Sequence, residues 1–417
     1  MSTLYRKSIL ATAFGLLSPA LFAAPTVSDV LVRQQWPWRN TIRVDFMLDG
    51  IGMSDVKFTF AAHDGETSLG VIPDAAIVGD RFADQNGLKT VTIDPTYAPA
   101  LRSLGKTERF RLDVTCAEIG GRVLYKVIDL AKTRGEAGQV RYITEAELKD
   151  TASSWGAYEV NPVPGVNSVI WTAPAATDSD YQKRFLVMRR IRPGSFGFGA
   201  TAAPVTLTKG FWMGVFETTG AQYTRFAKPT VTVGDCQPQR NVSQDGLRGE
   251  ACVWPADGHT VAAESFFGRL ATQVGENGFD LPTEAQWEYA CRAGTTDNAG
   301  YRSDKTLAEC AVYKDGTVTQ CQAVGTRAPN AWGLFDMIGN AWEHTLVWNS
   351  SAADPGDGYD PVGPAVAPDA NNHVVRGGAY ASGASNCSCV SRTADVNTTP
   401  TGTSGFHGFR IVQNGLW

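Results

Sequence analysis

The chain contains 417 residues, with 43% hydrophobic residues, 19% charged residues and a formal net charge of −5. At roughly 150 residues per domain, this length predicts two or three domains, each large enough to bury a core. The apolar content is too high for an intrinsically disordered chain, and the weak acidity without a basic stripe excludes nucleic-acid binding.

The first 23 residues have the order of a secretory signal peptide. Arg6 and Lys7 precede a short apolar stretch over residues 8–22, and alanines follow it. The stretch is too short for a stable bilayer span, and no later segment is apolar enough to cross a membrane. We therefore expect residues 1–23 to be removed and the protein to be secreted, either periplasmic or extracellular.

Residues 24–130 show the pattern of short half-buried strands. Apolar and polar residues alternate over 42–48 and 110–116, and a further strand is expected over 123–128. Several strands at this spacing predict an all-β sandwich of the immunoglobulin or fibronectin type. Cys116 faces inward in this pattern, and a buried apolar role is favoured over a functional thiol. Because no catalytic cluster is present, we interpret this domain as an adhesive or spacing module.

Residues 131–178 form a connecting region, in which Thr144 and Glu147 have capping-box spacing and predict a short helix over 144–150. Two more helices are expected, one beginning at Thr219 and one at Thr283, each with Gln three residues later. Beyond residue 340 turn-forming residues dominate, so ordered loops are expected there.

Four segments stand in a diagnostic order in the second half of the chain. They are LTKGFWMGVFETT at 207–219, FDLPTEAQWEYACR at 279–292, NAWGLFDMIGNAWE at 330–343, and RGGAY at 376–380 with its closing GFR at 408–410. Together they resemble the formylglycine-generating enzyme family, also called the sulfatase-modifying-factor family, over residues 179–417. The resemblance implies an α+β fold, C-type-lectin-like and with little regular structure, placed after the β-sandwich.

The resemblance and ligand chemistry together indicate a calcium site in the third segment. Asp336 and Glu343 supply carboxylates, and Gly339 and Ala341 supply backbone carbonyls, all hard oxygen ligands of the kind calcium prefers. The matching positions bind calcium in the family. The alternative is that the two carboxylates only cap turns and pair with arginine side chains.

The resemblance also locates the position of a copper site. Active family members carry two cysteines after the Arg-Gly-Gly motif, which bind Cu(I) and oxidise a substrate cysteine with O2. Here Ser382 stands at the first position and Cys387 at the second. A serine hydroxyl is a poor ligand for a soft ion, so the two-thiolate site is incomplete. We expect Cys387 to be the single accessible thiol.

Export gives the eight cysteines an oxidising environment, in which disulfides persist. We predict one bond between Cys236 and Cys252 and another between Cys310 and Cys321. The resemblance implies a third bond between Cys291 and Cys389.

Three functions remain open. The first is a secreted lectin-like binding or scaffold module that has lost copper chemistry, with a protein or glycan ligand. The second is an active protein-modifying oxidase that uses Cys387 and copper to convert a substrate cysteine to formylglycine. The third is a diversified ligand-binding display protein, since Lys, Glu, Gln, Met and Trp are all missing from residues 377–411.

Overall fold

The structure is a computed structural model that describes residues 24–35, 40–52, 54–79, 81–104, 108–144, 158–161, 168–171, 180–350, 353–367, 372–396 and 405–414. The expected signal peptide lies outside the described residues. The same holds for the helix expected over 144–150, of which only Thr144 is described, at the end of a strand. No helix in the described ranges is long and apolar enough to cross a membrane.

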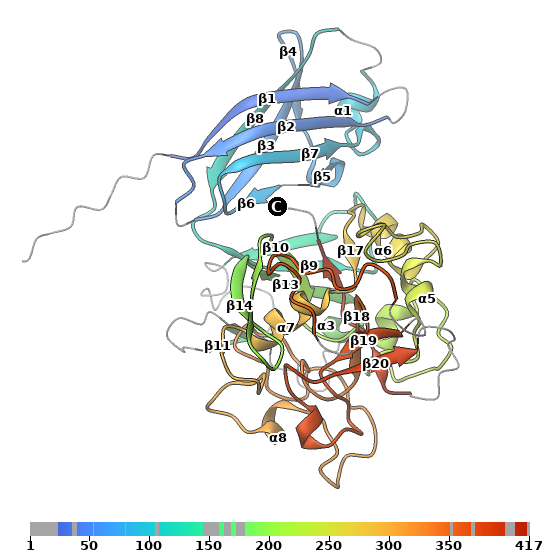
Figure 1. Cartoon of the computed structure of the whole chain (residues 1–417). Helices are drawn as coiled ribbons and strands as arrows, with labels where there is room; N and C mark the ends of the chain where they lie inside the picture. The colour runs from blue at the N-terminus through green and yellow to red at the C-terminus, as the bar shows by residue number, and fades with distance from the viewer. Residues whose placement is uncertain are drawn as a thin grey trace, which may run out of the picture.

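Two packed sheets form the N-terminal domain, as the alternating pattern predicts (Figure 1). One sheet has the order β1-β2-β7-β5, and in the other β3 pairs with β4, β6 and β8. The strands are β1 (Thr26–Gln34), β2 (Ile42–Asp49), β3 (Val56–Asp64), β4 (Thr67–Val71), β5 (Ile77–Gly79), β6 (Phe82–Ala83), β7 (Gly87–Ile93) and β8 (Phe110–Glu118). Short helical turns η1 (Asp74–Ala76), η2 (Pro95–Tyr97) and α1 (Pro99–Arg102) connect them.

The core of this domain lies between the two sheets. Phe46 on β2 meets Phe58 on β3 edge to face, with ring centroids 4.8 Å apart. Phe46 belongs to the alternating run predicted over residues 42–48, whereas β3, which carries Phe58 and alternates in the same way, was not predicted. Cys116 differs from the expectation, because its side chain is only partly buried at the edge of this core.

The strand expected over 123–128 forms as β9 (Val123–Asp129), but it belongs to a different sheet. It pairs with β10 (Val140–Thr144) on one side and with β13 (Phe185–Ile191) on the other. All seven residues of β9 are buried, as in a strand that is covered on both faces. The chain therefore enters the sheet of the second domain before residue 130.

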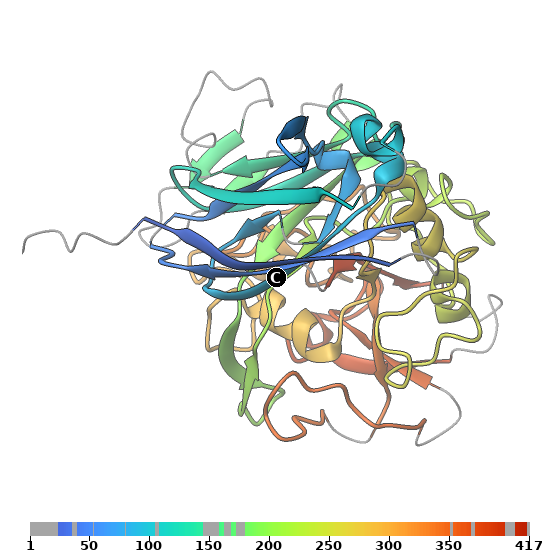
Figure 2. The same cartoon turned by 90° about the horizontal axis from the view of Figure 1, so that it is seen from above.

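The second domain is α+β, with a six-stranded sheet in the order β10-β9-β13-β16-β22-β17 and a four-stranded sheet in the order β20-β19-β18-β21. The remaining strands are β11 (Tyr158–Asn161), β12 (Ser168–Trp171), β14 (Gly194–Phe198), β15 (Ala203–Leu207), β16 (Phe211–Gly214), β17 (Phe279–Asp280), β18 (Trp342–Trp348), β19 (Asn372–Arg376), β20 (Arg392–Val396), β21 (His407–Gly408) and β22 (Val412–Gln413). Figure 2 shows the sandwich strands lying across this domain.

Both predicted capping boxes are present. Thr219 caps α4 (Gly220–Tyr223), and Thr283 caps α7 (Glu284–Arg292), each with reciprocal bonds to the Gln three residues on. The other helices are α3 (Asp180–Lys183), α5 (Gln244–Arg248), α6 (Phe266–Val274), α8 (Leu307–Cys310) and η3 (Ala384–Asn386). The nine-residue α6 was not expected, because its cap Ser265 is followed three residues later by Gly268 instead of Glu or Gln.

Buried ion pairs join the two domains. Asp55, just before β3, accepts the backbone N–H of Val123 at 2.8 Å and pairs with Arg190 of β13. Arg81 from the sandwich and Lys126 of β9 both pair with the buried Glu276. Burial by itself raises the pKa of Glu276, but the two cations outweigh it and bring the pKa down to about 2. These paired charges hold the sandwich against the six-stranded sheet.

Candidate functional site

Helix α7 anchors the C-terminal loop through a network of buried charges. Arg376, at the end of β19, pairs with Glu288 and lies 3.6 Å from Glu284, both on α7. Arg392 of β20 also bonds Glu284, with Nε 2.9 Å from Oε1. Because Glu284 and Glu288 are one helical turn apart, they face the same two strands. The second and fourth sequence segments therefore meet at this network.

The glycines after Arg376 allow the chain to turn tightly beneath α7. Gly377 and Gly378 have φ of 96° and 86°, in the left-handed region. A Cβ on Gly378 would lie 2.4 Å from the carbonyl oxygen of Asn386 and 3.0 Å from Cys387 Sγ. Only glycine fits at this position, and its absence of a side chain brings the loop that carries Cys387 against the core.

Three of the predicted cysteines meet in one core. Cys291, Cys387 and Cys389 belong to the same buried cluster, which also contains Trp287. Cys389 Sγ lies 2.8 Å from Cys291 Sγ, and burial together with this contact raises the pKa of Cys291 well above its ordinary value. The pairing implied by the resemblance therefore has its two sulfur atoms side by side, as thiols.

The expectation that Cys387 is accessible is wrong. Its side chain is 3% exposed, and burial raises the pKa of the thiol to about 12. A thiol of this kind is protonated at neutral pH and is neither a good nucleophile nor a good metal ligand. The sequence did not reveal this because the loop is rich in small polar residues, whereas Cys387 turns inward from it.

Ser382 is partly buried in the turn that precedes Cys387. Its hydroxyl oxygen accepts the backbone N–H of Ala379 at 3.0 Å, and its carbonyl accepts the N–H of Lys314 at 2.9 Å. The side chain stabilises the turn locally. Its hydroxyl supplies no soft ligand, so this pair of residues does not fit copper.

All eight cysteines are described, and all eight are free thiols, so none of the three predicted disulfides is formed. The carbonyl of Cys236 accepts the N–H of Val324, whereas the carbonyl of Cys252 accepts a bond from Arg248 of α5. The thiol of Cys321 donates to the carbonyl of Asn340 at 3.2 Å, and not to Cys310.

The predicted calcium segment folds around a buried cluster of charges. Glu343 accepts Trp287 Nε1 at 2.7 Å and pairs with Arg410, whose Nη2 lies 2.7 Å from Oε1. Arg410 also donates to the carbonyls of Gly214, Val215 and Phe335 at 2.7–2.9 Å. For Glu343 the arginine-pairing alternative is therefore the one that forms.

Asp336 is engaged differently. Oδ2 accepts the N–H of Gly325 at 2.6 Å, whereas Oδ1 is buried without a hydrogen-bond partner. Burial raises its pKa to about 6, against the opposing effect of Arg410. Asp336, Gly339 and Asn340 all have φ between 55° and 81°, so the segment between the two carboxylates is curled.

Glu217 completes this cluster, and the sequence analysis did not select it. It is fully buried and accepts the Nδ2 of Asn340 and the N–H of Ala341, at 2.6 and 2.9 Å. Burial and the negative charges of Asp336 and Glu343 raise its pKa well above the ordinary range. Three carboxyl groups thus surround one guanidinium. The sequence feature that could have identified Glu217 is its position in the first of the four family segments.

Of the carboxylate oxygens in this cluster, Asp336 Oδ1 is the one that is available to a calcium ion. The cluster also contains more acidic than basic side chains. No group of three or more His, Cys, Asp or Glu side chains is arranged to hold a metal ion within the described ranges. A calcium ion here would therefore depend on backbone carbonyls, such as those of Gly339 and Ala341, beside the carboxylate.

A family model described as "Sulfatase-modifying factor enzyme 1-like domain" matches residues 175–415. The formylglycine-generating enzyme of Bos taurus is 30% identical over 149 residues, which cover 33% of this chain and 39% of that protein. The enzyme of the same name from Thermomonospora curvata is 30% identical over 155 residues, which cover 33% and 50%. The chain thus spans half or less of the length of these curated relatives.

Two solved structures are also similar. Treponema denticola variable protein 1 is 22% identical with a TM-score of 0.42, covering 55% of this chain and 95% of that one. PvdO from Pseudomonas aeruginosa is 16% identical with a TM-score of 0.44, covering 55% and 94%.

Proposed function

Because the chain belongs to the sulfatase-modifying factor family, we propose that it uses the family domain as a binding or scaffold module and does not oxidise cysteine with copper. The observation that carries this proposal is the state of Cys387. Its thiol is 3% exposed with a pKa of about 12, and the hydroxyl of Ser382 stands at the first ligand position, where active family members carry the other cysteine. Two accessible thiolates are what Cu(I) requires, and neither is supplied.

The test is an oxidation assay on the reduced, full-length protein. A Cys-x-Pro-x-Arg peptide is incubated with protein, copper and O2, and conversion of the thiol to an aldehyde is followed by mass spectrometry. We expect no conversion by the wild type and none by Cys387→Ala. The similar Thermomonospora curvata enzyme serves as the positive control for the peptide and copper. Conversion by the wild type that is lost in Cys387→Ala would refute the proposal.

Calcium binding is part of this proposal. Asp336 Oδ1 lacks a partner and the cluster holds more carboxyl groups than cations, which together favour a bound divalent ion. Asp336 and the carbonyls of Gly339 and Ala341 would hold the ion, while Glu343 stays with Arg410. The ion would supply structural charge balance in the loop.

We also propose export, because the first 23 residues have the order of a signal peptide. In an oxidising compartment the contact between Cys291 and Cys389 would close as a disulfide. Export is also where a module of this kind meets protein or glycan ligands. Comparing the N-terminal residue of the protein from the culture medium or periplasm with that of the cytoplasmic protein tests this step.

A further inference from the structure

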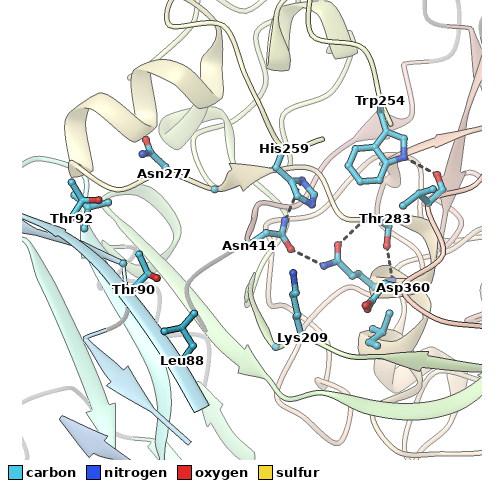
Figure 3. A pocket seen from close by; sticks show the side chains of 17 residues that line it. Leu88, Thr90, Thr92, Lys209, Trp254, His259, Asn277, Thr283, Asp360 and Asn414 are labelled. Carbon is cyan, nitrogen blue, oxygen red and sulfur yellow. Dashed lines mark hydrogen bonds between the residues drawn. The ribbon is translucent and has the colours of Figure 1, made fainter. Parts of the chain in front are cut away.

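A cavity of about 720 Å³ lies between the two domains, and no cysteine is among the described residues that line it (Figure 3). Strands β5 and β7 of the sandwich line one side, and residues of the second domain line the other. Thr283 and Gln286 bring the N-terminal end of α7 to the cavity, whereas Cys291 lies near the opposite end of that helix. The volume is within the range of small-molecule sites in proteins.

The polar lining consists mainly of neutral groups that hydrogen-bond. They are the side chains of Thr90, Thr92, Asn277, Thr283, Gln286 and Asn414. Gln286 is already positioned, since its Nε2 donates to Asn414 Oδ1 at 2.7 Å. Trp254, Leu88 and Val362 add apolar surface, and Leu88 and Val362 are exposed. This mixture of hydroxyls, amides and apolar wall suits a ligand with many hydroxyl groups and C–H faces.

One imidazole at the cavity is held in a fixed orientation. Asp280 is fully buried, and Arg248 Nε donates to its Oδ1 at 2.8 Å. Its Oδ2 lies 3.0 Å from His259 Nδ1, so Nδ1 carries the proton and donates it to the carboxylate. The Nε2 of His259 is then left to hydrogen-bond a ligand. A partly exposed ring held by a buried ion pair is a feature of a built site.

The cavity also carries one available cation. Lys209, just after β15, is exposed and has no salt bridge among the residues that the structure describes. Figure 3 shows its side chain extending toward Asn414. The acid across from it, Asp360, is occupied, because both carboxylate oxygens accept bonds from Thr208. Lys209 is therefore the lining group that remains to pair with an anionic part of a ligand.

We propose that this interdomain cavity binds an acidic saccharide of the uronic-acid type. His259 Nε2 and the threonine and amide side chains bond its hydroxyls, and Lys209 bonds its carboxylate. The proposal names a ligand class for the binding function proposed above and rests on it. The two are tested separately, since a protein without oxidase activity can still fail to bind saccharides.

The test is a binding titration of the full-length protein with two matched probes, methyl β-glucuronide and methyl β-glucoside, which differ at a single carboxylate. We expect the glucuronide to bind about tenfold more tightly, as for a hydrogen bond to a charged group. Lys209→Met should remove this preference. Lys228→Met, a change at another exposed lysine outside the cavity, should preserve it.

A second variant tests the sandwich side of the cavity. Thr92→Val keeps the shape of the side chain but removes its hydroxyl, and it should weaken both probes equally. Absence of saturable binding at millimolar probe, or equal affinity for the two probes, would overturn the proposal. So would binding that neither Thr92→Val nor Lys209→Met alters, since the ligand would then bind elsewhere.

Discussion

Replacing Arg410 by methionine tests whether the buried cluster is held together by this one cation. Arg410 is fully buried and bonds both oxygens of Glu343, at distances between 2.7 and 3.2 Å. Methionine keeps an unbranched apolar stem but is shorter and carries neither charge nor donors. Arg410→Met leaves Glu343 bonded to Trp287, with Glu217 and Asp336 as acidic neighbours, and removes donors from three carbonyls.

Breaking a buried ion pair by removing one partner costs about 3–5 kcal/mol, because the remaining charge is uncompensated. Since domains are typically stable by about 5–15 kcal/mol, this loss is a large fraction of the total. We therefore expect a clear fall in the urea midpoint of Arg410→Met, followed by tryptophan fluorescence in a chelating buffer. Far-ultraviolet circular dichroism in the absence of urea checks that the variant is folded.

A double-mutant cycle separates two contributions to the loss of stability in Arg410→Met, namely the uncompensated charge and the lost packing. Glu343→Gln alone should be destabilising, but adding it to Arg410→Met should cost less than the sum, because it removes the uncompensated carboxylate. The coupling should be about 1–3 kcal/mol. If the losses of stability are additive, or if Arg410→Met loses less than about 1 kcal/mol, then solvent or a rearrangement compensates the charge of Glu343.

Four further predictions concern Asp336 and the cysteines. Burial raises the pKa of Asp336 from 3.8 to about 6, so without metal its ionisation costs stability as the pH rises from about 4 to 6. Asp336→Asn should lose less stability than the wild type over that interval, and a parallel pH profile would contradict the assignment. Calcium should raise the melting temperature of the wild type, increasingly so up to pH 6, but not that of Asp336→Ala; an equal shift in both would end the calcium proposal. Mild oxidation should join Cys291 to Cys389, contributing about 4.7 kcal/mol in the chain-entropy model for a loop of this length; peptide mapping that finds Cys387 in the bond would refute the pairing. A maleimide probe should label Cys387 in denaturant but not in the native protein, and rapid native labelling would contradict its burial.

Local signals in the sequence predicted the elements that depend on near neighbours. The capping boxes at Thr219 and Thr283 are each complete within four residues, and both form. The alternation around Phe46 likewise needs only one strand and one solvated face. In contrast, β18 was missed because nearly all of Trp342–Trp348 is buried, which removes the alternation that marks a strand.

Features that depend on distant segments could not be predicted in the same way. The pattern of β9 identifies a strand, but its partner β13 begins more than fifty residues later. The burial of Cys387 depends on Gly378 and on the α7 core, neither of which is visible in the loop's composition. The interdomain cavity had no sequence signal, since His259 and Lys209 are lone residues that only the folded chain brings to one place.

The position of β9 has a consequence for how this protein can be divided. A fragment cut at residue 175, where the family match begins, lacks the strand that pairs with β13 over Phe185–Arg189. The backbone N–H and C=O groups on that side of β13 would then be open to pairing with another chain, which is a known route to aggregation. A fragment that begins near Gly120, ahead of β9, keeps the sheet closed on this side and is the one we expect to be monodisperse.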